Sequence, residues 1–374
     1  MVAIGDDRMK IAIVCNTPYQ LMCTLNYAYH TKKEKSAGID LYLGNNFAGF
    51  DKAYSRLQKL DLFENIYVFQ PRLRGKTLWG NVDRFLNIVS PKRCLNSFLK
   101  EPNVFLNKKY DLILASVASY FVVALILLCP GAEVQYYDDG SGSYARELSV
   151  CLLSPLAVRT NRLLGRDINR IIPTKILLNC PELASEEVKA KAQPLPPLWE
   201  APAELRDLLH DLWNYHDDGY YRSKKLICLL SPNDDALSGL DRFQSDIQKR
   251  VPDICENYIA RLHPRQKPEE YAGCKLDSHG DMWELVCASQ ITDEHVLLAD
   301  LSTAQMTPKM LYDVEPVLIF SYRAYPEGYW ASFVQRREEI VERLKASYRH
   351  KDRILVPETP EELWECVKEH CKNT

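Results

Sequence analysis

Short apolar runs alternate with amphipathic stretches along most of this chain. The first run, KIAIVCN at 10–16, is followed directly by the sequence TPYQ at 17–20. Threonine, proline and glutamine at these spacings are typical of a helix start, so we expect a strand and then a helix from 18 to about 30. The same reasoning predicts further strands in the first half of the chain, at 40–43, 65–69, 111–116 and 133–137. Strands that alternate with helices indicate a parallel, doubly wound sheet.

The most apolar stretch of the chain, 112–131, has about the length that crosses a bilayer. Ser116, Ser119 and the Cys-Pro-Gly sequence at its end divide this stretch into a strand and a helix at 117–128. A second strand follows at the spacing of a βαβ unit. The sequence therefore predicts a buried strand and helix here, and no integral membrane segment.

The alternating pattern breaks between about 193 and 225, where the proline-rich sequence PLPPLWEAPAEL occurs. We expect a first α/β domain at 1–195, a linker at 196–224 and a second α/β domain at 225–374. The second domain is predicted to hold strands at 225–230, 257–262, 296–300 and 316–320, and a helix at 359–372.

Composition and charge narrow the class of protein. Hydrophobic residues make up 46% of the chain and charged residues 26%, which is typical of a folded globular protein. The net charge of −3, from 47 basic and 50 acidic residues, gives no global field for nucleic acid, so an anionic substrate must be bound by local groups. The twelve cysteines form no C-x-x-C pair, and Asp6 and Asp7 near the start do not fit a signal peptide, so we expect reduced thiols and a cytoplasmic protein.

Two adjacent aspartates stand out in the sequence YYDDGSG, directly after a predicted strand. Asp138, Asp139, Gly140 and Ser141 would lie beyond the carboxyl end of that strand, where open α/β sheets bind ligands. Adjacent side chains point in different directions, so one carboxylate can face a substrate while the other holds the loop. A solvated turn is the alternative, because D-D-G-S is also good turn chemistry.

A second candidate follows a strand of the second domain. In the sequence RLHPR, His263 would project beyond the strand end, with Pro264 next to it and Arg261 and Arg265 as local cations. A histidine can donate to a phosphate oxygen and can transfer protons near neutral pH. The alternative is a structural histidine with no part in catalysis.

Three weaker candidates also lie in the second domain. Ser302 and Thr303 follow a predicted strand and precede a helix, where hydroxyls and backbone N–H groups bind phosphate readily, although ordinary helix capping explains them equally well. Ser231 lies in the sequence LLSP at the end of the domain's first strand. Glu284, after Trp283, offers an acceptor for ribose hydroxyls beside an apolar wall.

The order of D-D-G-S, H-P and S-T resembles the motif set of bacterial sialyltransferases. The sequences CNTPYQ, YYDDGSG, LLSP and HPRQ are similar, in order and spacing, to glycosyltransferase family 52, which contains lipooligosaccharide sialyltransferases. This resemblance implies a GT-B-like fold, with two doubly wound Rossmann-like domains and a cleft between them. Fold alone does not give the chemistry, so the motif residues carry the functional expectation.

The resemblance implies a role for each motif residue. Asp138 corresponds to the general base, His263 to the group at the CMP phosphate that acts as acid or electrostatic stabiliser, and Ser302 and Thr303 to phosphate ligands. The remaining residues expected to bind substrate are Asn16, Thr17, Gln20, Asp139, Gly140, Ser141, Ser231, Pro264, Arg265 and, at the ribose, Glu284.

The implied reaction is inverting transfer of N-acetylneuraminic acid from CMP-sialic acid to a terminal sugar hydroxyl, such as a galactoside of a bacterial surface glycan or lipooligosaccharide. The resemblance implies no metal or other cofactor and no nucleic-acid partner. It is compatible with a homodimer and with peripheral contact at the inner face of the cytoplasmic membrane. Two alternatives stay open: a family 52 transferase of another sugar, and a non-catalytic protein that binds a nucleotide sugar or a glycan.

Overall fold

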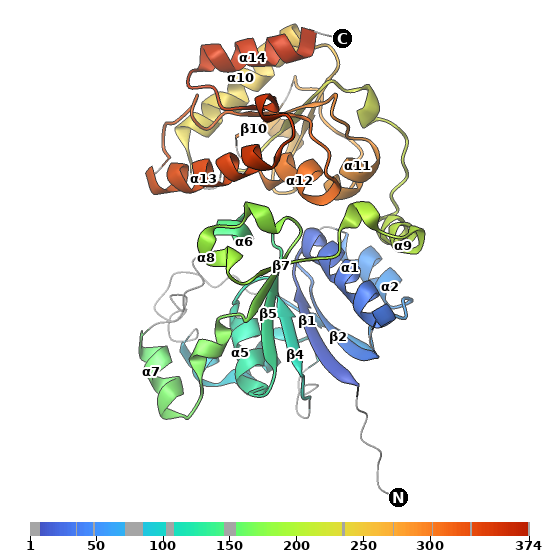
Figure 1. Cartoon of the computed structure of the whole chain (residues 1–374), viewed down its shortest axis with the longest axis vertical. Coiled ribbons are helices and arrows are strands. Elements are labelled where there is room, and N and C mark those ends of the chain that lie inside the picture. Colours follow the sequence, from blue (N-terminus) through green and yellow to red (C-terminus); the bar gives the residue numbers. More distant parts are fainter. Residues whose placement is uncertain are drawn as a thin grey trace, which may run out of the picture. The chain divides into compact units, whose positions relative to one another are not determined.

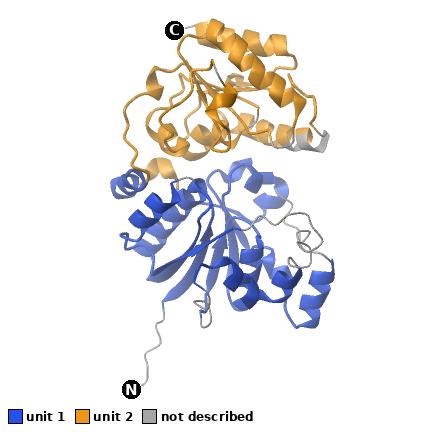
Figure 2. Cartoon of the chain, turned by 180° about the vertical axis from the view of Figure 1, so that it is seen from behind, with its two compact units in different colours: residues 1–196, 202–212 blue, residues 197–201, 213–374 orange. Residues whose placement is uncertain are grey.

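The computed structural model describes residues 8–34, 36–47, 49–71, 85–101, 108–145, 155–233, 236–271, 273–300, 302–329 and 331–372. Within it the chain forms two compact units (Figure 2). Unit 1 comprises residues 1–196 and 202–212, and unit 2 comprises residues 197–201 and 213–374. Each unit is built around one parallel sheet.

The sheet of unit 1 has seven strands in the order β3-β2-β1-β4-β5-β6-β7 (Figure 1). Every neighbouring pair is parallel, so all the carboxyl ends lie at one edge. The central strands are almost fully buried, which explains their continuous apolar sequences. The strands are β1 (Met9–Cys15), β2 (Ala37–Gly44), β3 (Asn65–Phe69), β4 (Leu112–Ala115), β5 (Glu133–Tyr137), β6 (Lys175–Leu178) and β7 (Ala192–Pro194).

The helices of unit 1 connect these strands. The predicted helix start at Thr17 is present, because the Thr17 hydroxyl accepts from the Gln20 N–H at 3.2 Å. The Gln20 side chain reaches back one residue further than a capping box requires, and accepts from the N–H of Asn16 at 2.6 Å. The helices are α1 (Pro18–Glu34), α2 (Phe50–Leu57), α4 (Pro91–Phe98), α5 (Tyr120–Leu128), α6 (Gly142–Ala145), α7 (Pro155–Leu163), η2 (Ile168–Ile171), η3 (Pro181–Leu183), α8 (Glu186–Lys189) and α9 (Ala203–Trp213).

The apolar stretch at 112–131 divides as the sequence predicts. It forms β4 and then α5, and the side chain of Ser119 caps α5 by accepting from the N–H of Val122. Both elements are buried within unit 1. Over the part of the chain that the structure describes, none of the helices combines the length and the apolar character that a bilayer crossing requires.

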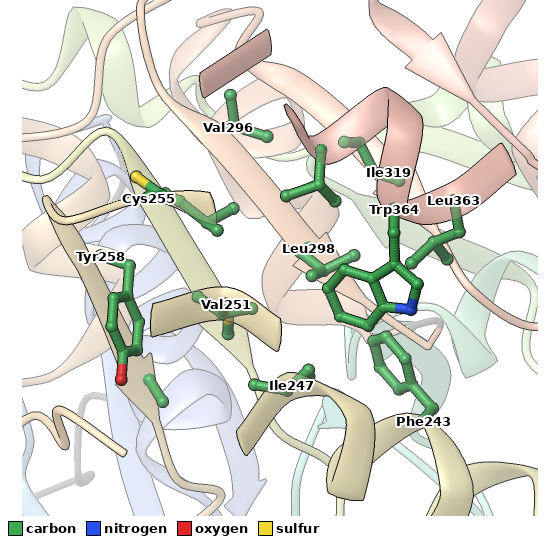
Figure 3. Packing of buried hydrophobic residues seen from close by; sticks show 14 of the residues in the cluster. Phe243, Ile247, Val251, Cys255, Tyr258, Val296, Leu298, Ile319, Leu363 and Trp364 are labelled. Atoms are coloured by element: carbon green, nitrogen blue, oxygen red, sulfur yellow. The ribbon is translucent and has the colours of Figure 1, made fainter. Parts of the chain in front are cut away.

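The sheet of unit 2 has five parallel strands in the order β12-β11-β10-β8-β9. Figure 3 shows the core on one side of it, where Phe243 and Ile247 from α10 and Trp364 from α14 pack on Leu298 and Ile319 of the sheet. The strands are β8 (Leu226–Leu229), β9 (Tyr258–Arg261), β10 (Val296–Ala299), β11 (Val317–Phe320) and β12 (Ile354–Leu355). The helices are η4 (Leu198–Glu200), η5 (Tyr221–Ser223), α10 (Ser238–Ile254), η6 (Pro268–Tyr271), α11 (Trp283–Ser289), α12 (Thr303–Tyr312), α13 (Ala331–Ser347), η7 (Lys351–Arg353) and α14 (Pro360–Lys372).

The segment 196–224, which the sequence assigns to the linker, carries regular structure. It contains η4, α9 and η5, and the chain passes from unit 1 into unit 2 at 197–201 and back again before it finally enters unit 2 at 213. Within unit 1 the carbonyl of Leu212 accepts from the Arg56 side chain at 2.8 Å, which ties the end of α9 to α2.

Candidate functional site

Each sheet has one topological switch point, where consecutive connections leave in opposite directions. In unit 1 this point lies between β1 and β4, and in unit 2 it lies between β8 and β10. Ligands of open α/β sheets bind beyond the carboxyl ends of the strands around such a point. The motif residues follow β1 and β5 in unit 1, and β8, β9 and β10 in unit 2, so they line the edges where a site is expected.

Asp138 is fully buried directly after β5. One carboxylate oxygen accepts from the N–H of Gly140 at 2.8 Å. The other accepts from the Tyr144 hydroxyl and from both the backbone and the side-chain N–H of Asn179, each of the latter at 3.1 Å. Burial raises the pKa of Asp138, and these hydrogen bonds oppose that rise. Four donors thus surround the buried carboxylate, three of them on one oxygen, so Asp138 holds the loop in place.

The hydrogen bond from Gly140 to Asp138 requires a backbone conformation that glycine adopts without strain. Its φ of 87° lies in the left-handed region, where a side chain would be strained. That conformation turns the chain so that the N–H of Gly140 points back at Asp138. Ser141 follows at the turn and is partly exposed, and its carbonyl accepts from the N–H of Tyr144 at 3.3 Å.

Asp139 differs from Asp138 in being partly exposed. Its carboxylate accepts from the side-chain nitrogen of Gln20 at 2.5 Å, and its backbone N–H donates to the Ser143 hydroxyl at 2.8 Å. Gln20 is buried, and its other side-chain atom accepts from the N–H of Asn16. The start of α1 and the D-D-G-S loop are thus joined through one glutamine, which orients the Asp139 carboxylate.

Asn16 carries a buried polar atom with unused hydrogen-bonding capacity. Its side-chain oxygen is inaccessible to solvent and accepts no hydrogen bond in the described part of the chain. It lies against Gly44, where an added Cβ would approach this oxygen to 2.7 Å and the side-chain oxygen of Asn46 to 3.2 Å. Both amide oxygens therefore lie close to Gly44, at the carboxyl ends of β1 and β2, and leave no room for a side chain at that position.

His263 is partly exposed beyond β9, and the loop fixes its ring. Its Nδ1 accepts from the backbone N–H of Arg265 at 3.2 Å. The hydrogen bond at one ring nitrogen sets the tautomer, so the neutral ring carries its hydrogen on Nε2. This geometry makes His263 a donor through Nε2. Pro264 and Arg265 are exposed next to it.

A glutamine of the same motif joins this loop to its neighbour. The side-chain oxygen of Gln266 accepts from the N–H of His263 at 2.8 Å, and its side-chain nitrogen donates to the carbonyl of Ser231 at 2.9 Å. Gln244 of α10 donates to the same carbonyl at 2.6 Å and accepts from the Tyr271 hydroxyl at 2.6 Å. The H-P and LLSP sequences are therefore held in one polar network at the ends of β8 and β9.

Ser302 and Thr303 lie where the sequence predicts a helix start. Ser302 is the N-cap of α12, and its hydroxyl oxygen accepts from the N–H of Ala304 at 3.3 Å. Both residues are partly exposed. The first turn of α12 places two hydroxyl groups and the positive end of the helix dipole at the end of β10, which suits a phosphate.

Glu284 lies close to this turn because α11 is tied to α12. The indole N–H of Trp283 donates to the carbonyl of Ala304 at 2.7 Å. Glu284 is the second residue of α11 and is partly exposed, and burial of its carboxyl group raises its pKa. The structure therefore brings the S-T residues and Glu284 together on adjacent helices.

Arg261 does not act as a surface cation beside His263. It forms an ion pair with Asp277 at 2.6 Å, donates to the Tyr221 hydroxyl at 2.8 Å and lies over the Trp283 ring. Asp277 is sixteen residues further along the chain, so the sequence near Arg261 gave no sign of the pairing. Arg265 alone of the two arginines is exposed.

Within each unit, the structure thus gathers the motif residues at the carboxyl edge. Unit 1 holds Asn16, Thr17, Gln20 and the D-D-G-S loop, and unit 2 holds the H-P, S-T and LLSP residues with Glu284. Sequence reasoning missed Asn179, Tyr144 and Gln266. Asn179 directly follows the buried strand β6, and the rule that polar residues after buried strands form sites would have found it had that strand been recognised.

Solved structures show which fold this is. The chain is similar to S. aureus MnaA in complex with UDP, with a TM-score of 0.53 and 11% identity over 98% of this chain and 88% of that one. It is similar to the GT-B domain of a sialyltransferase from Photobacterium damselae, with a TM-score of 0.51 and 11% identity over 93% of this chain and 100% of that one. It is also similar to the spinosyn rhamnosyltransferase SpnG complexed with thymidine diphosphate, with a TM-score of 0.50 and 12% identity over 97% and 90% of the chains.

These similarities, together with the two parallel sheets, confirm the expected fold class: an α/β protein of GT-B type with two Rossmann-like domains. No family model matches the chain, and no curated protein sequence matches it. The resemblance to family 52 therefore stays a prediction, and fold alone does not assign the reaction.

Proposed function

We propose that this protein is an inverting sialyltransferase that moves N-acetylneuraminic acid from its CMP-activated form to a terminal sugar hydroxyl. The observation that carries the proposal is the placement of the motifs on the fold. On a GT-B chain, the D-D-G-S, H-P and S-T sequences all lie at carboxyl edges of the two sheets, where such folds bind substrates. A sialyltransferase with the same fold supports the choice of donor.

Unit 2 supplies the groups that suit the nucleotide. The first turn of α12 with Ser302 and Thr303 offers donors for the phosphate, and His263 offers its Nε2–H. Exposed Arg265 adds a positive charge to the same loop. Glu284, beside the first turn of α12, is assigned to the ribose hydroxyls.

Unit 1 supplies the groups that suit the acceptor. Gln20 orients the partly exposed Asp139 carboxylate, and the family resemblance assigns Asn16 to the same side of the reaction. Family resemblance points to Asp138 as the base, but four hydrogen bonds and complete burial support a different role for it. We therefore assign the proton transfer to Asp139 and the ordering of the loop to Asp138.

The reaction is a single displacement at C2 of the sialic acid. The acceptor oxygen forms a bond to C2 as the bond from C2 to the CMP phosphate oxygen breaks, through an oxocarbenium-like transition state that inverts the anomeric centre. The hydroxyl proton passes to the Asp139 carboxylate. Negative charge grows on the departing phosphate, where His263, the hydroxyls of Ser302 and Thr303 and the positive end of the α12 dipole stabilise it.

A donor screen tests the proposal. The purified protein is given CMP-sialic acid and other nucleotide sugars with lactose-type acceptors, and released nucleotide and glycoside are measured. We expect CMP and a sialoside in equal amounts. Turnover only with another donor would assign the protein to a different sugar, and binding without turnover would make it a non-catalytic nucleotide-sugar or glycan-binding protein.

Chelation of metals should leave most of the activity intact. The phosphate charge is assigned to protein donors, and within the described ranges no three His, Cys, Asp or Glu side chains gather as a metal site would require. The rate of sialyl transfer is measured with EDTA and then with added magnesium. A complete loss that magnesium restores would show that a cation handles the leaving group.

Replacing Gln266 should weaken catalysis without weakening acceptor binding. Gln266→Ala removes the acceptor for the His263 N–H and a donor to Ser231, so the His263 ring loses its fixed position. We expect kcat to fall by roughly tenfold to a hundredfold, the scale of a small misplacement, with little change in the KM of the acceptor.

The matched control for this variant is Gln248→Ala. Gln248 lies nearby on α10, and its side chain donates to the carbonyl of Glu270 at 3.2 Å, away from the His263 loop network. This control should retain its kcat. A normal kcat in Gln266→Ala with lowered thermal stability would instead show that the network only stabilises unit 2.

A further inference from the structure

Helix α7 exposes leucines that a globular surface normally buries. Leu156 is 61% exposed, Leu163 is 82% exposed, and Leu164, in the turn that ends the helix, is 53% exposed. Leu156 and Leu163 are seven residues apart and therefore lie on the same face of the helix. Isolated exposed leucines are common, but two on one face of a nine-residue helix and a third in the turn that follows it call for a partner.

The opposite face of α7 is packed against unit 1, so the leucines are not exposed because the helix has frayed. Ala157 and Asn161 are fully buried, and the Asn161 side chain donates to the Ala157 carbonyl at 2.9 Å. Arg166, just beyond the helix, donates to the carbonyl of Val89 at 2.7 Å and to Asn161 at 3.2 Å. The helix is thus fixed on unit 1 by one face, and the opposite face is left to solvent.

The exposed face is positively charged. Arg159 lies between Leu156 and Leu163 on the same face, and Arg162 is exposed beside it. α7 contains no acidic residue, and the next acid along the chain, Asp167, caps η2 through its own carboxylate. The chain as a whole carries a net charge of −3, so this concentration of basic charge is local.

The exposed face of α7 lies near the amino ends of the strands, whereas the motif residues lie at their carboxyl ends. The short helix η2 packs against α7. The side chain of Arg170, which lies in η2, donates to the carbonyls of Cys129 and Ala132, just before β5 begins. β5 then runs away from this edge to Asp138 at its carboxyl end. Figure 1 shows α7 at the far end of unit 1 from α6, which follows the D-D-G-S loop. A partner bound at α7 leaves the D-D-G-S loop uncovered.

We propose that the α7 surface, formed by Leu156, Arg159, Arg162, Leu163 and Leu164, docks on an anionic lipid membrane. Leucines enter the boundary between headgroups and acyl chains, while arginines between them pair with lipid phosphates. A second copy of the chain fits less well, because a symmetric contact would bring the arginines of both copies together. Nucleic acid fits less well because it offers no apolar layer for the leucines.

Vesicle sedimentation of the full chain tests the proposal. The probes are phosphatidylcholine vesicles with and without phosphatidylglycerol. The protein should sediment with the anionic vesicles, less at high salt, and weakly with neutral ones. Arg159→Glu with Arg162→Glu should lower the partition constant at least 25-fold, since each basic residue near an anionic surface contributes about fivefold. Leu163→Ser alone should lower it roughly tenfold.

Three further variants serve as controls. Arg206→Glu reverses an exposed charge on α9, Trp199→Ser removes an exposed apolar side chain from η4, and both should bind vesicles like the wild type. Leu163→Trp should increase binding to the vesicles, because tryptophan favours the membrane interface. Such an increase could not be explained by unfolding of the variant. All variants should keep their activity on a soluble acceptor.

Several outcomes would overturn the proposal. The wild type could fail to bind anionic vesicles, or the arginine and leucine variants could bind as well as the wild type. The wild type could also be a dimer that Leu163→Ser converts to a monomer, in which case a second copy covers the α7 surface.

Discussion

Asp139→Asn should lower kcat for sialyl transfer by roughly 10²–10⁴, the usual contribution of a positioned acid–base group. The amide keeps the shape of the side chain and can still bond to Gln20 through its oxygen, but it cannot take the hydroxyl proton. Asp139 is partly exposed, so the melting temperature should stay close to that of the wild type. The affinity for CMP should also stay the same, because the groups proposed to bind the nucleotide are all in unit 2.

Asp138→Asn is the matched comparison, and its main effect should be on stability. In the wild type, the N–H groups of Gly140 and Asn179 donate to different oxygens of the Asp138 carboxylate. An asparagine side chain has only one oxygen, so its NH₂ group must face one of these two donors. A buried unsatisfied pair of this kind costs about 1–3 kcal/mol, which corresponds to a fall in Tm of roughly 3–10 °C. The loop that carries Asp139 would also lose its order, so activity would fall together with stability.

The melting temperatures of the wild type and of Asp138→Asn should also differ in their dependence on pH. Because burial raises the pKa of Asp138, the folded protein binds this proton more tightly than the unfolded chain does. The contribution of Asp138 to stability is therefore complete below the unfolded pKa of about 4 and declines as the pH rises through the raised value. The difference in Tm between wild type and Asp138→Asn should shrink in that direction.

The reverse result would return the base to Asp138. If folded Asp138→Asn keeps the wild-type Tm and loses kcat, while Asp139→Asn remains active, then the loop must open during catalysis to expose Asp138. That outcome would agree with the family resemblance and would make the hydrogen-bonded loop a resting conformation.

The strands that were predicted most accurately are those in which burial on both faces produces a continuous apolar run. β1, β4 and β10 are examples, and their predicted and observed limits agree within one or two residues. β7 could not be predicted, because its sequence AQP is short, polar and largely exposed at the sheet edge. β6 is apolar but only four residues long, and a run of that length is as common in a buried helix as in a strand.

The position of the motif residues at strand ends was predictable, because the apolar runs before them mark where the strands end. Their division of labour was not, because it depends on partners distant in sequence. Asp138 and Asp139 are neighbours in the chain, yet one is sequestered by Asn179, 41 residues away, and the other is bonded by Gln20, 119 residues away. Local sequence carries no sign of either partner, so chemistry that depends on burial and on used lone pairs appears only once the chain is folded.

His263→Ala should lower kcat by roughly 10²–10⁴, the scale of one positioned donor at a site of developing charge. The ring is partly exposed and makes its Nδ1 contact to a backbone N–H, so its loss should leave the Tm nearly unchanged. A structural histidine would give the opposite pattern, with a lowered Tm and a normal kcat in the protein that remains folded.

The hydrogen bond at Nδ1 of His263 leads to a more specific prediction for His263→Gln. The Arg265 N–H donates to Nδ1, so the ring donates through Nε2. A glutamine amide can also donate a hydrogen bond, so His263→Gln should keep clearly more activity than His263→Ala. Equal losses in both variants would favour a true proton donor, since glutamine cannot release a proton.

Donors with a better leaving group separate His263 from Asp139. A sialyl donor whose leaving group needs little stabilisation should restore much of the rate to His263→Ala, because the charge that His263 stabilises is then borne by the leaving group itself. The same donor should help Asp139→Asn far less, because the acceptor hydroxyl must still lose its proton. If both variants recover equally, or neither recovers, the two residues do not divide the reaction between the leaving group and the acceptor, even in an active sialyltransferase.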